Sequence, residues 1–350
     1  MTLDDPAAIP KVDESGMYPL MEKTADRLAA PDDSEATCKI KFEMPKNIVF
    51  GGVGGSGIVG DILTDYCRDL IKLPAVTCRS VNVPAFVDSE TLFVAISYSG
   101  ETVETLHMFE QAKSAKAKLT VVCSGGKLLN RAKSFGLPYL KVTAGMPPRV
   151  ALPELVGAVT HVLGESNILE DARGLLDLGS KAVREVTDSV KVTVPSKQNP
   201  AKQLASALKN RLPLLIGNED HVSVLRRFKN ELNENSKVPA IFQTLPEACH
   251  DDVEGLKALQ ELTTPQPVVL RGLHETEEEA KVVEKLVELF SQLKFPLPHF
   301  FSGVGEDKFG WLLSAVTFGD FVSFYLAVLN GVDPSKVALI PHFRAVRGQV

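Results

Sequence analysis

Residues Asn47–Asp61 read NIVFGGVGGSGIVGD, in which an apolar run passes into a cluster of glycines and then into a helix-like pattern. The glycines satisfy the pattern G-x-G-x-x-G twice, from Gly52 to Gly57 and from Gly55 to Gly60. This pattern is the dinucleotide-binding fingerprint, and it also describes any loop whose backbone N–H groups approach a phosphate. The stretch therefore predicts a strand, a phosphate-binding loop and a helix, and it leaves the identity of the phosphate open.

Around this loop, short apolar and β-rich runs alternate with segments of helical periodicity. Because such alternation is typical of parallel sheets covered by helices, the sequence predicts an α/β fold of doubly wound parallel sheets. A second alternating set follows a helical, proline-marked stretch, so we predict two such domains in tandem. The predicted parts are an N-terminal helix and linker (1–40), a first domain with the phosphate-binding loops (41–165), a helical crossover (166–200) and a second domain with C-terminal helices (201–350).

Two helices are predicted from their apolar patterns near the two ends of the chain. Residues 13–30 have the pattern of one amphipathic helix, followed by a polar, acidic linker. Residues 311–331 are apolar almost all round. We therefore expect this second helix to be buried, either in a core or across a subunit interface.

The composition argues against several classes of partner. The formal net charge is −6, whereas a nucleic-acid binder needs a basic surface, so no nucleic-acid partner is expected. No uninterrupted apolar run approaches the roughly 18 residues of a membrane span, and the N-terminus lacks a basic, apolar signal segment, so no membrane partner is expected. The cysteines form no C-x-x-C pair, which favours neither disulfides nor a metal site and suits a cytoplasmic protein. These cysteines are Cys38, Cys67, Cys78, Cys123 and Cys249.

A nicotinamide site requires more than glycines. It needs an acidic residue at the end of the second strand, about 20 residues further on, to accept the ribose hydroxyls. That strand ends here with Arg79 and Ser80, so no carboxylate is placed for NAD. Binding of NADP through Arg79 stays open as an alternative, as does a purely structural tight turn.

Hydroxyl side chains gather where the third predicted strand ends. Ser97, Ser99 and Thr102 stand at the end of an apolar run and directly before a predicted helix. Hydroxyl donors, backbone N–H groups and a helix dipole together suit a phosphate dianion. Plain helix capping, by Ser99 with Thr102 or by Thr102 with Thr105, is the alternative. Because Ser56 in the glycine loop adds a further hydroxyl, the sequence favours a neutral phosphate-binding cup.

Five segments together resemble the bifunctional phosphoglucose/phosphomannose isomerase family, a branch of the phosphoglucose isomerase superfamily built from two sugar isomerase (SIS) domains. They occur in the order typical of the family, and the resemblance runs from about residue 13 to the C-terminus. The segments are GGVGGSG (51–57), SYSGETVETL (97–106), NELNENSKVPA (230–240), the segment around His250 and GDFVSFYLAVLNGVDP (319–334).

The resemblance implies an aldose–ketose isomerase with two tandem SIS domains. Its substrates would be glucose 6-phosphate and mannose 6-phosphate, each exchanged with fructose 6-phosphate through ring opening and a cis-enediol(ate). The sugar's own carbonyl acidifies the proton that moves, so no cofactor and no metal is expected. A homodimer with the active site near the subunit interface is also implied. An isomerase of another sugar phosphate and a non-catalytic sugar-phosphate-binding protein stay open.

The resemblance also assigns roles to single residues. Arg149 matches the arginine that stabilises the enediolate, although a surface arginine in an ordinary salt bridge is the alternative reading. Glu234 matches the base that moves the proton, although a solvated glutamate would look the same. His250 matches the ring-opening histidine, for which a neutral pKa is suitable. The residues implied to bind the 6-phosphate are Gly55, Ser56, Ser97, Ser99 and Thr102.

The chain departs from the family near its C-terminus. The family carries a lysine in its last helix that assists ring opening, and continuing without gaps from GVDP places Arg344 there. Lys336 is the nearest lysine upstream. Because arginine keeps the charge but hardly loses a proton, the resemblance assigns His250 no second proton donor in ring opening.

Overall fold

The computed structural model describes residues 3–29 and 42–346, apart from the side chains of Ala29 and Arg344. Cys38 and the predicted acidic linker (31–37) therefore lie outside the described residues. The chain forms two compact units. The first unit holds Lys23–Ser180, and the second unit joins the first 22 residues to the chain from Lys181 onward. Each unit contains one parallel sheet, so the predicted α/β class with helix-flanked parallel sheets is confirmed.

The first unit contains a five-stranded parallel sheet in the order β2-β1-β3-β4-β5. The strands are β1 (Asn47–Gly51), β2 (Ala75–Cys78), β3 (Thr91–Ser97), β4 (Lys118–Cys123) and β5 (Tyr139–Lys141). The chain leaves β1 toward one side of the sheet and then crosses back to β3 on the other side. Ligands bind open sheets of this kind at such a reversal, outside the carboxyl ends of the strands. The order differs from the 3-2-1-4-5-6 order of dinucleotide-binding sheets.

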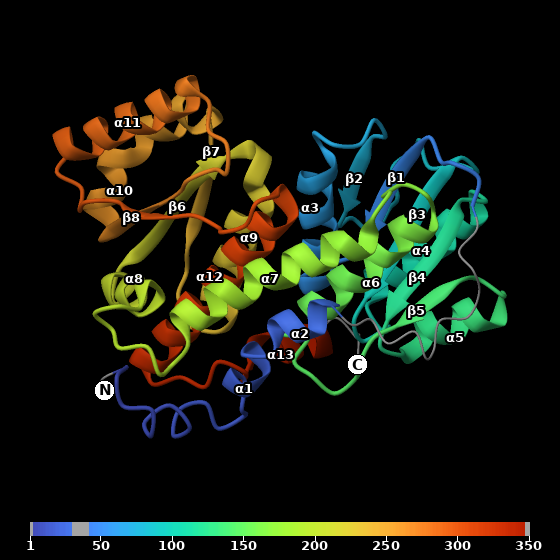
Figure 1. The fold of residues 1–350 in the computed structure, drawn as a ribbon, viewed down its shortest axis with the longest axis horizontal. Helices are drawn as coiled ribbons and strands as arrows, with labels where there is room; N and C mark the ends of the chain where they lie inside the picture. The colour runs from blue at the N-terminus through green and yellow to red at the C-terminus, as the bar shows by residue number, and fades with distance from the viewer. Residues whose placement is uncertain (1–2, 30–41, 347–350) are drawn as a thin grey trace. The chain divides into compact units, whose positions relative to one another are not determined.

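Helices cover both faces of this sheet (Figure 1). Alternate strand residues such as Val49 and Phe93 form one core with α4 and α5. On the opposite face, α3 packs so closely on Phe50 that a Cβ atom on Gly60 would lie 2.8 Å from the phenylalanine Cβ. The helices of this unit are α2 (Thr24–Ala29), α3 (Gly55–Cys67), α4 (Val103–Ser114), α5 (Gly126–Ser134), α6 (Leu152–Glu165) and the beginning of α7 (Ala172–Val190).

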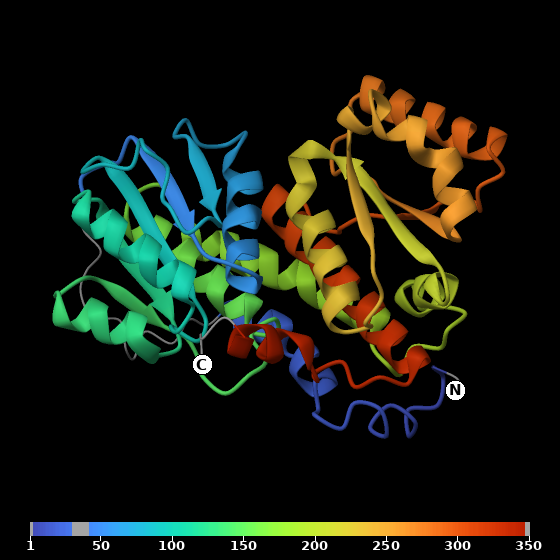
Figure 2. The same cartoon turned by 180° about the vertical axis from the view of Figure 1, so that it is seen from behind.

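The second unit contains a four-stranded parallel sheet in the order β7-β6-β8-β9 (Figure 2). Its strands are β6 (Leu212–Asn218), β7 (Ile241–Leu245), β8 (Pro265–Leu270) and β9 (His299–Phe301). One face packs on α10 (Leu256–Leu262) and α11 (Glu277–Gln292) through an apolar core. The helices α8 (Pro200–Leu208), α9 (Val222–Glu234) and α12 (Lys308–Asn330) cover the other face.

The core helix of the second unit is α12. It begins where the Asp307 carboxylate accepts hydrogen bonds from the N–H groups of Phe309 and Gly310, at 2.9 and 3.0 Å. It ends at Gly331, whose φ of 67° suits a glycine C-cap. By length and composition α12 would be able to cross a membrane, but 89% of its most apolar window is buried inside the protein. The prediction that this helix is buried is confirmed, and it is buried in a core.

The prediction of one helix over residues 13–30 is wrong. Two short helices stand there instead, α1 (Tyr18–Met21) and α2. Gly16 takes a φ of 70°, and the Asp13 carboxylate accepts hydrogen bonds from the N–H groups of Met17 and Tyr18, both at 2.8 Å. The chain therefore turns before α1, and this local turn overrides the amphipathic pattern. Helix α3 begins at Gly55, within the glycine cluster itself.

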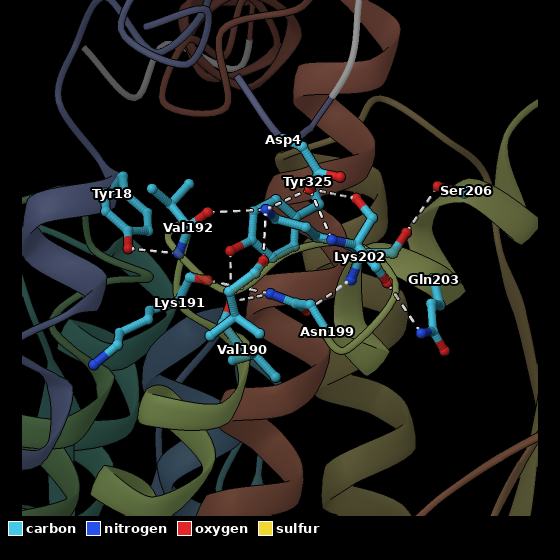
Figure 3. Close-up of polar contacts among 12 residues, drawn as sticks. Asp4, Tyr18, Val190, Lys191, Val192, Asn199, Lys202, Gln203, Ser206 and Tyr325 are labelled. Atoms are coloured by element: carbon cyan, nitrogen blue, oxygen red, sulfur yellow. Dashed lines mark hydrogen bonds and ion pairs between the residues drawn. The ribbon is translucent and has the colours of Figure 1, made fainter. Parts of the chain in front are cut away.

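A fully buried lysine organises the crossover between α7 and α8 (Figure 3). The ammonium of Lys202 donates to the carbonyl oxygens of Val192 and Val194, both at 2.9 Å, and to the Asp4 carboxylate at 3.2 Å. Asn199 caps α8 by accepting from the Lys202 N–H at 3.0 Å. The first residues of the chain are thereby fastened to the loop that precedes α8.

Candidate active site

In the glycine loop between β1 and α3, the backbone packs directly against the backbone at the end of β3. A Cβ atom on Gly52 would lie 2.9 Å from the carbonyl oxygen of Ile96, at the end of β3. Gly54 occupies the N-cap of α3 with a φ of 61°, and as a glycine it has no side chain to cap the first turn. The N-terminal N–H groups of an α-helix need partners from outside the helix. This helix end is therefore suited to an anion.

A second loop, between β3 and α4, carries the predicted hydroxyls. The Ser97 hydroxyl accepts from the N–H of Gly100 at 3.2 Å and donates to the Thr102 hydroxyl at 3.1 Å. Thr102 stands at the N-cap of α4, but its side chain makes no capping hydrogen bond. The Thr105 hydroxyl, one turn further on, is buried with no hydrogen-bond partner among the described residues. Helix capping by Thr102, the alternative raised by the sequence, is therefore wrong.

Tyr98 joins these two loops to a third. Its N–H donates to the Ser56 hydroxyl at 3.2 Å, so Ser56 lies beside the Ser97 and Thr102 pair. Its carbonyl oxygen accepts from the N–H and the hydroxyl of Ser124, after β4, at 2.8 and 2.6 Å. Ser99 is exposed, and its hydroxyl accepts the Glu101 N–H at 3.2 Å.

The predicted phosphate residues therefore come together at the carboxyl ends of β1 and β3. Gly55 begins α3, Ser56 follows it, and Ser97 and Thr102 face each other across the next loop. Two helix N-termini without side-chain caps, those of α3 and α4, lie at this point. Neutral donors and helix dipoles can stabilise a dianion here without a lysine or arginine.

The side chain of Arg79, the residue considered for NADP binding, already has two partners within the first unit. Its guanidinium forms an ion pair with the buried Asp61 of α3 and donates to the carbonyl oxygen of Gly57 at 2.9 Å. A dinucleotide 2′-phosphate would have to compete with both partners. Together with the strand order, this pairing argues against an NADP site.

Arg149 lies next to the glycine loop. A Cβ atom on Gly55 would be 3.9 Å from the Cα of Arg149. The side chain of Arg149 belongs to a residue that is only 5% exposed, so the reading as a surface arginine is wrong. The preceding loop is fastened by Tyr98, whose hydroxyl accepts the Met146 N–H at 2.9 Å. Burial raises the pKa of Tyr98, so this hydroxyl stays neutral at physiological pH.

The remaining predicted residues lie in the second unit. Glu234 is the last residue of α9 and is half-buried. The helix ends there because Lys237 takes a φ of 58°, and its ammonium donates to the carbonyl oxygens of Glu234 and Asn235, at 2.8 and 3.1 Å. The same ammonium donates to the carbonyl oxygen of Asp333 at 2.9 Å. Two of the landmark segments, NENSK and GVDP, are thereby joined.

A buried ionic network supports the end of α9. The Arg227 guanidinium forms two 2.9 Å hydrogen bonds with Asp320 and lies 2.8 Å from the Glu231 carboxylate. The Asn235 amide donates to Glu231 at 2.9 Å. Burial by itself would lower the pKa of Arg227, but Asp320, Glu231 and Glu234 together raise it. Arg227 therefore stays charged, and Glu234 lies within its electrostatic field.

His250 and Arg344 lie on two further elements of the second unit. His250 is exposed and closes a short 3₁₀ turn, η3 (Glu247–Cys249), where its N–H donates to the Glu247 carbonyl oxygen at 2.8 Å. Arg344 belongs to α13 (Leu339–Val346), and its side chain lies outside the described residues. Lys336, the nearest upstream lysine, is paired with Glu14 at 2.5 Å.

The sequence did not single out Tyr98. Its place between two predicted phosphate-binding serines in SYSG hinted at a role in the site. Only the strand order, however, shows which loops its N–H, its carbonyl oxygen and its hydroxyl contact. Over residues 3–29 and 42–346, the structure shows no group of three or more histidine, cysteine, aspartate or glutamate side chains able to hold a metal ion.

Comparison with known proteins identifies relatives across the whole chain. A family model described as bacterial phospho-glucose isomerase C-terminal SIS domain matches residues 197–346. A bifunctional phosphoglucose/phosphomannose isomerase from Caldicellulosiruptor bescii is 30% identical over 305 residues, covering 86% of this chain and 89% of the relative. A D-glucosamine-6-phosphate 4-epimerase from Sulfolobus acidocaldarius is 32% identical over 211 residues, covering 60% of this chain and 63% of the relative. The solved structure of a glucose-6-phosphate isomerase like protein from Thermus thermophilus shares the fold, with a TM-score of 0.67, 17% identity and 99% of each chain covered.

Proposed function

Because the chain belongs to the bifunctional phosphoglucose/phosphomannose isomerase family, we propose that it interconverts glucose 6-phosphate and mannose 6-phosphate with fructose 6-phosphate. The observation that carries this proposal is the meeting of two helix N-termini without side-chain caps and three hydroxyls at the strand-order reversal of the first unit. Such a cup suits a phosphate ester on a neutral sugar, because it supplies many donors and no full charge.

In this proposal the cup holds the 6-phosphate in the same way throughout the reaction. Gly55 and the first turn of α3 donate backbone N–H groups. The hydroxyls of Ser56, Ser97 and Thr102 donate to the phosphate oxygens, and the exposed Ser99 closes the outer side. The phosphate thus anchors the substrate, while the chemistry takes place at C1 and C2.

The catalytic steps are assigned to four residues. His250 moves a proton during ring opening, because imidazole both donates and accepts near neutral pH. Arg344, which replaces the family lysine, orients the ring oxygen or the anomeric hydroxyl. Glu234 carries the proton between C1 and C2 through the cis-enediol(ate). Arg149 stabilises the negative charge that develops on oxygen.

The proposal also covers the cellular compartment, the oligomeric state and the domain limits of the enzyme. We place it in the cytoplasm as a homodimer with its active site near the subunit interface, acting on hexose 6-phosphates without a cofactor or a metal. The predicted domain limits at residues 40, 165 and 200 are kept as part of the proposal.

A coupled assay tests the reaction. Purified protein is incubated with fructose 6-phosphate, and glucose 6-phosphate and mannose 6-phosphate are measured separately. We expect both aldoses to form, and incubation in D₂O should place deuterium at C2 of each. Formation of neither product contradicts the proposed activity.

A second candidate function is favoured by one relative. The glucosamine-6-phosphate 4-epimerase shares 32% identity, although over a shorter part of the chain. The same cup would hold an amino sugar 6-phosphate. Glucosamine 6-phosphate is therefore included in the assay, and its turnover in place of fructose 6-phosphate would support this second function.

A further inference from the structure

One tyrosine connects the phosphate cup to the loop that carries Arg149. We call residues 142–149 the Arg149 loop. Tyr98 follows the last residue of β3 and stands between two residues of the proposed cup, Ser97 and Ser99. Its N–H donates to Ser56, and its hydroxyl accepts from Met146 in the Arg149 loop at 2.9 Å. A single side chain and its own backbone therefore touch both halves of the site in the first unit.

Backbone hydrogen bonds fix the two ends of the Arg149 loop: the Val142 N–H donates to the Cys123 carbonyl oxygen at 3.0 Å, and the Val150 N–H donates to the Pro147 carbonyl oxygen at 2.9 Å. Pro147 and Pro148 carry no N–H, so Met146 is the last residue before Arg149 that is able to donate a backbone hydrogen bond. Gly145 takes a φ of 90°, a conformation that favours glycine. Further back, the Thr143 N–H donates to the Glu154 carboxylate at 2.9 Å. The hydrogen bond to Tyr98 thus uses the last backbone donor before Arg149.

We propose that Tyr98 is a positioning residue that holds Arg149 at the distance from the bound phosphate that the enediolate requires. This inference rests on the proposed function, in which Arg149 stabilises the enediolate. The cup fixes one end of the substrate, and the Tyr98 hydroxyl fixes the loop that serves the other end. A displacement of even about 1 Å in a catalytic group is costly, because electrostatic stabilisation depends on preorganised geometry.

The proposal predicts that Tyr98→Phe weakens the stabilisation of the enediolate and leaves phosphate binding intact. This variant keeps the ring and the backbone contact to Ser56, and it removes only the acceptor for the Met146 N–H. We expect kcat for fructose 6-phosphate to fall about tenfold, with KM changed less than threefold. Tyr139→Phe, which removes a hydroxyl from another buried tyrosine of the same sheet, serves as the matched control and should behave as wild type.

Binding measurements test the same idea without turnover. Two probes are used: inorganic phosphate, which occupies the cup alone, and 5-phosphoarabinonate, whose planar carboxylate imitates the enediolate. In Tyr98→Phe, the Kd of inorganic phosphate should stay within twofold of wild type, whereas that of 5-phosphoarabinonate should rise about tenfold. In an Arg149→Gln background, Tyr98→Phe should add little to the loss, because the two residues act through one contact.

The outcomes distinguish this inference from the proposed function. If wild type shows no isomerase activity, the proposed function fails, and the two Kd ratios still report on the Tyr98 contact. If wild type is active but Tyr98→Phe keeps its kcat and its Kd for 5-phosphoarabinonate, the positioning role is wrong. An equal loss of both probes, or full additivity with Arg149→Gln, would show that Tyr98 merely supports the fold.

Discussion

Ser97 and Thr102 share a hydrogen bond at 3.1 Å, and the proposed phosphate cup requires each hydroxyl to turn to a phosphate oxygen. Replacing either residue by alanine should raise KM for fructose 6-phosphate more than it lowers kcat, because the phosphate is held alike in the ground and transition states. Each lost hydrogen bond to a charged group should cost about 1.5–3 kcal/mol. Steady-state kinetics measure the effect, with the exposed Ser134→Ala as control. Unchanged KM values in both variants would rule out the cup.

Glu234 gives the second prediction for a single residue. Glu234→Gln preserves shape and hydrogen bonding but cannot accept the C2 proton, so kcat should fall by roughly 10² or more. Binding of 5-phosphoarabinonate should survive, because the support from Lys237 and the Arg227 network does not involve the proton. Glu261→Gln, an exposed position on α10, is the control. Near-normal turnover in Glu234→Gln would assign the base to another residue.

The sequence predicts single residues well where chemistry and position in the chain coincide. Ser97 ends β3, and Ser56 and Thr102 lie within five residues of the ends of β1 and β3, so the parallel arrangement brings the three hydroxyls together, while their binding of phosphate stays a prediction. The role of Tyr98 was not predictable, because its contacts depend on which strands become neighbours. Burial of Arg149 was missed for a similar reason, since two prolines before an arginine indicate a loop and say nothing of what covers it.

At the scale of helices and strands, the two sheets differ at their reversal points. In the first unit, α3 and α4 begin without side-chain caps. In the second unit, α9 after β6 also begins without a side-chain cap, but α11 after β8 has a first turn closed by a capping box between Thr276 and Glu279. Three glutamates occupy that turn, and the helix dipole there is already matched by negative charge. At the first turn of α11, a phosphate would find N–H groups that are already hydrogen-bonded and would be repelled by the glutamate carboxylates.

This contrast predicts one phosphate site per chain. Calorimetric titration with inorganic phosphate should give a stoichiometry near one, placed in the first unit. Ser97→Ala should weaken that single site, whereas Thr276→Ala should leave phosphate affinity unchanged, although it removes the cap of α11. Two equivalent sites, or loss of binding in Thr276→Ala, would contradict the assignment of the cup to the first unit.

Long, strongly patterned elements were predictable, and short ones were not. The apolar pattern predicted a helix over 311–331, and α12 spans Lys308–Asn330. A pattern that continues over 23 residues outweighs the turn or capping preferences of single residues. Over residues 13–30 the amphipathic pattern was overruled by Gly16 and by the Asp13 turn. Strand order was beyond the sequence as well, because it is set by how each connection crosses the sheet.

At the scale of the whole molecule, the second unit is built from both ends of the chain. Ser15 donates to the Asp333 carboxylate at 2.8 Å, and Glu14 pairs with Lys336. Near the start of the chain, Asp4 accepts from Lys202. Contacts over such long sequence separations leave no local pattern, which is why the sequence treats the first residues as a separate helix and linker.

The last prediction concerns the buried lysine at the centre of these contacts. Lys202→Met keeps most of the side-chain volume but leaves the carbonyl oxygens of Val192 and Val194 without their donor. Each unsatisfied carbonyl costs about 1–3 kcal/mol, so the free energy of unfolding should fall by roughly 2–6 kcal/mol. Urea unfolding followed by the fluorescence of Trp311, the single tryptophan and fully buried in α12, reports on the second unit. The control is Lys197→Met, an exposed lysine in the same crossover, which should shift the midpoint little. Equal midpoints for the two variants would show that Lys202 fills space in the crossover without fastening it.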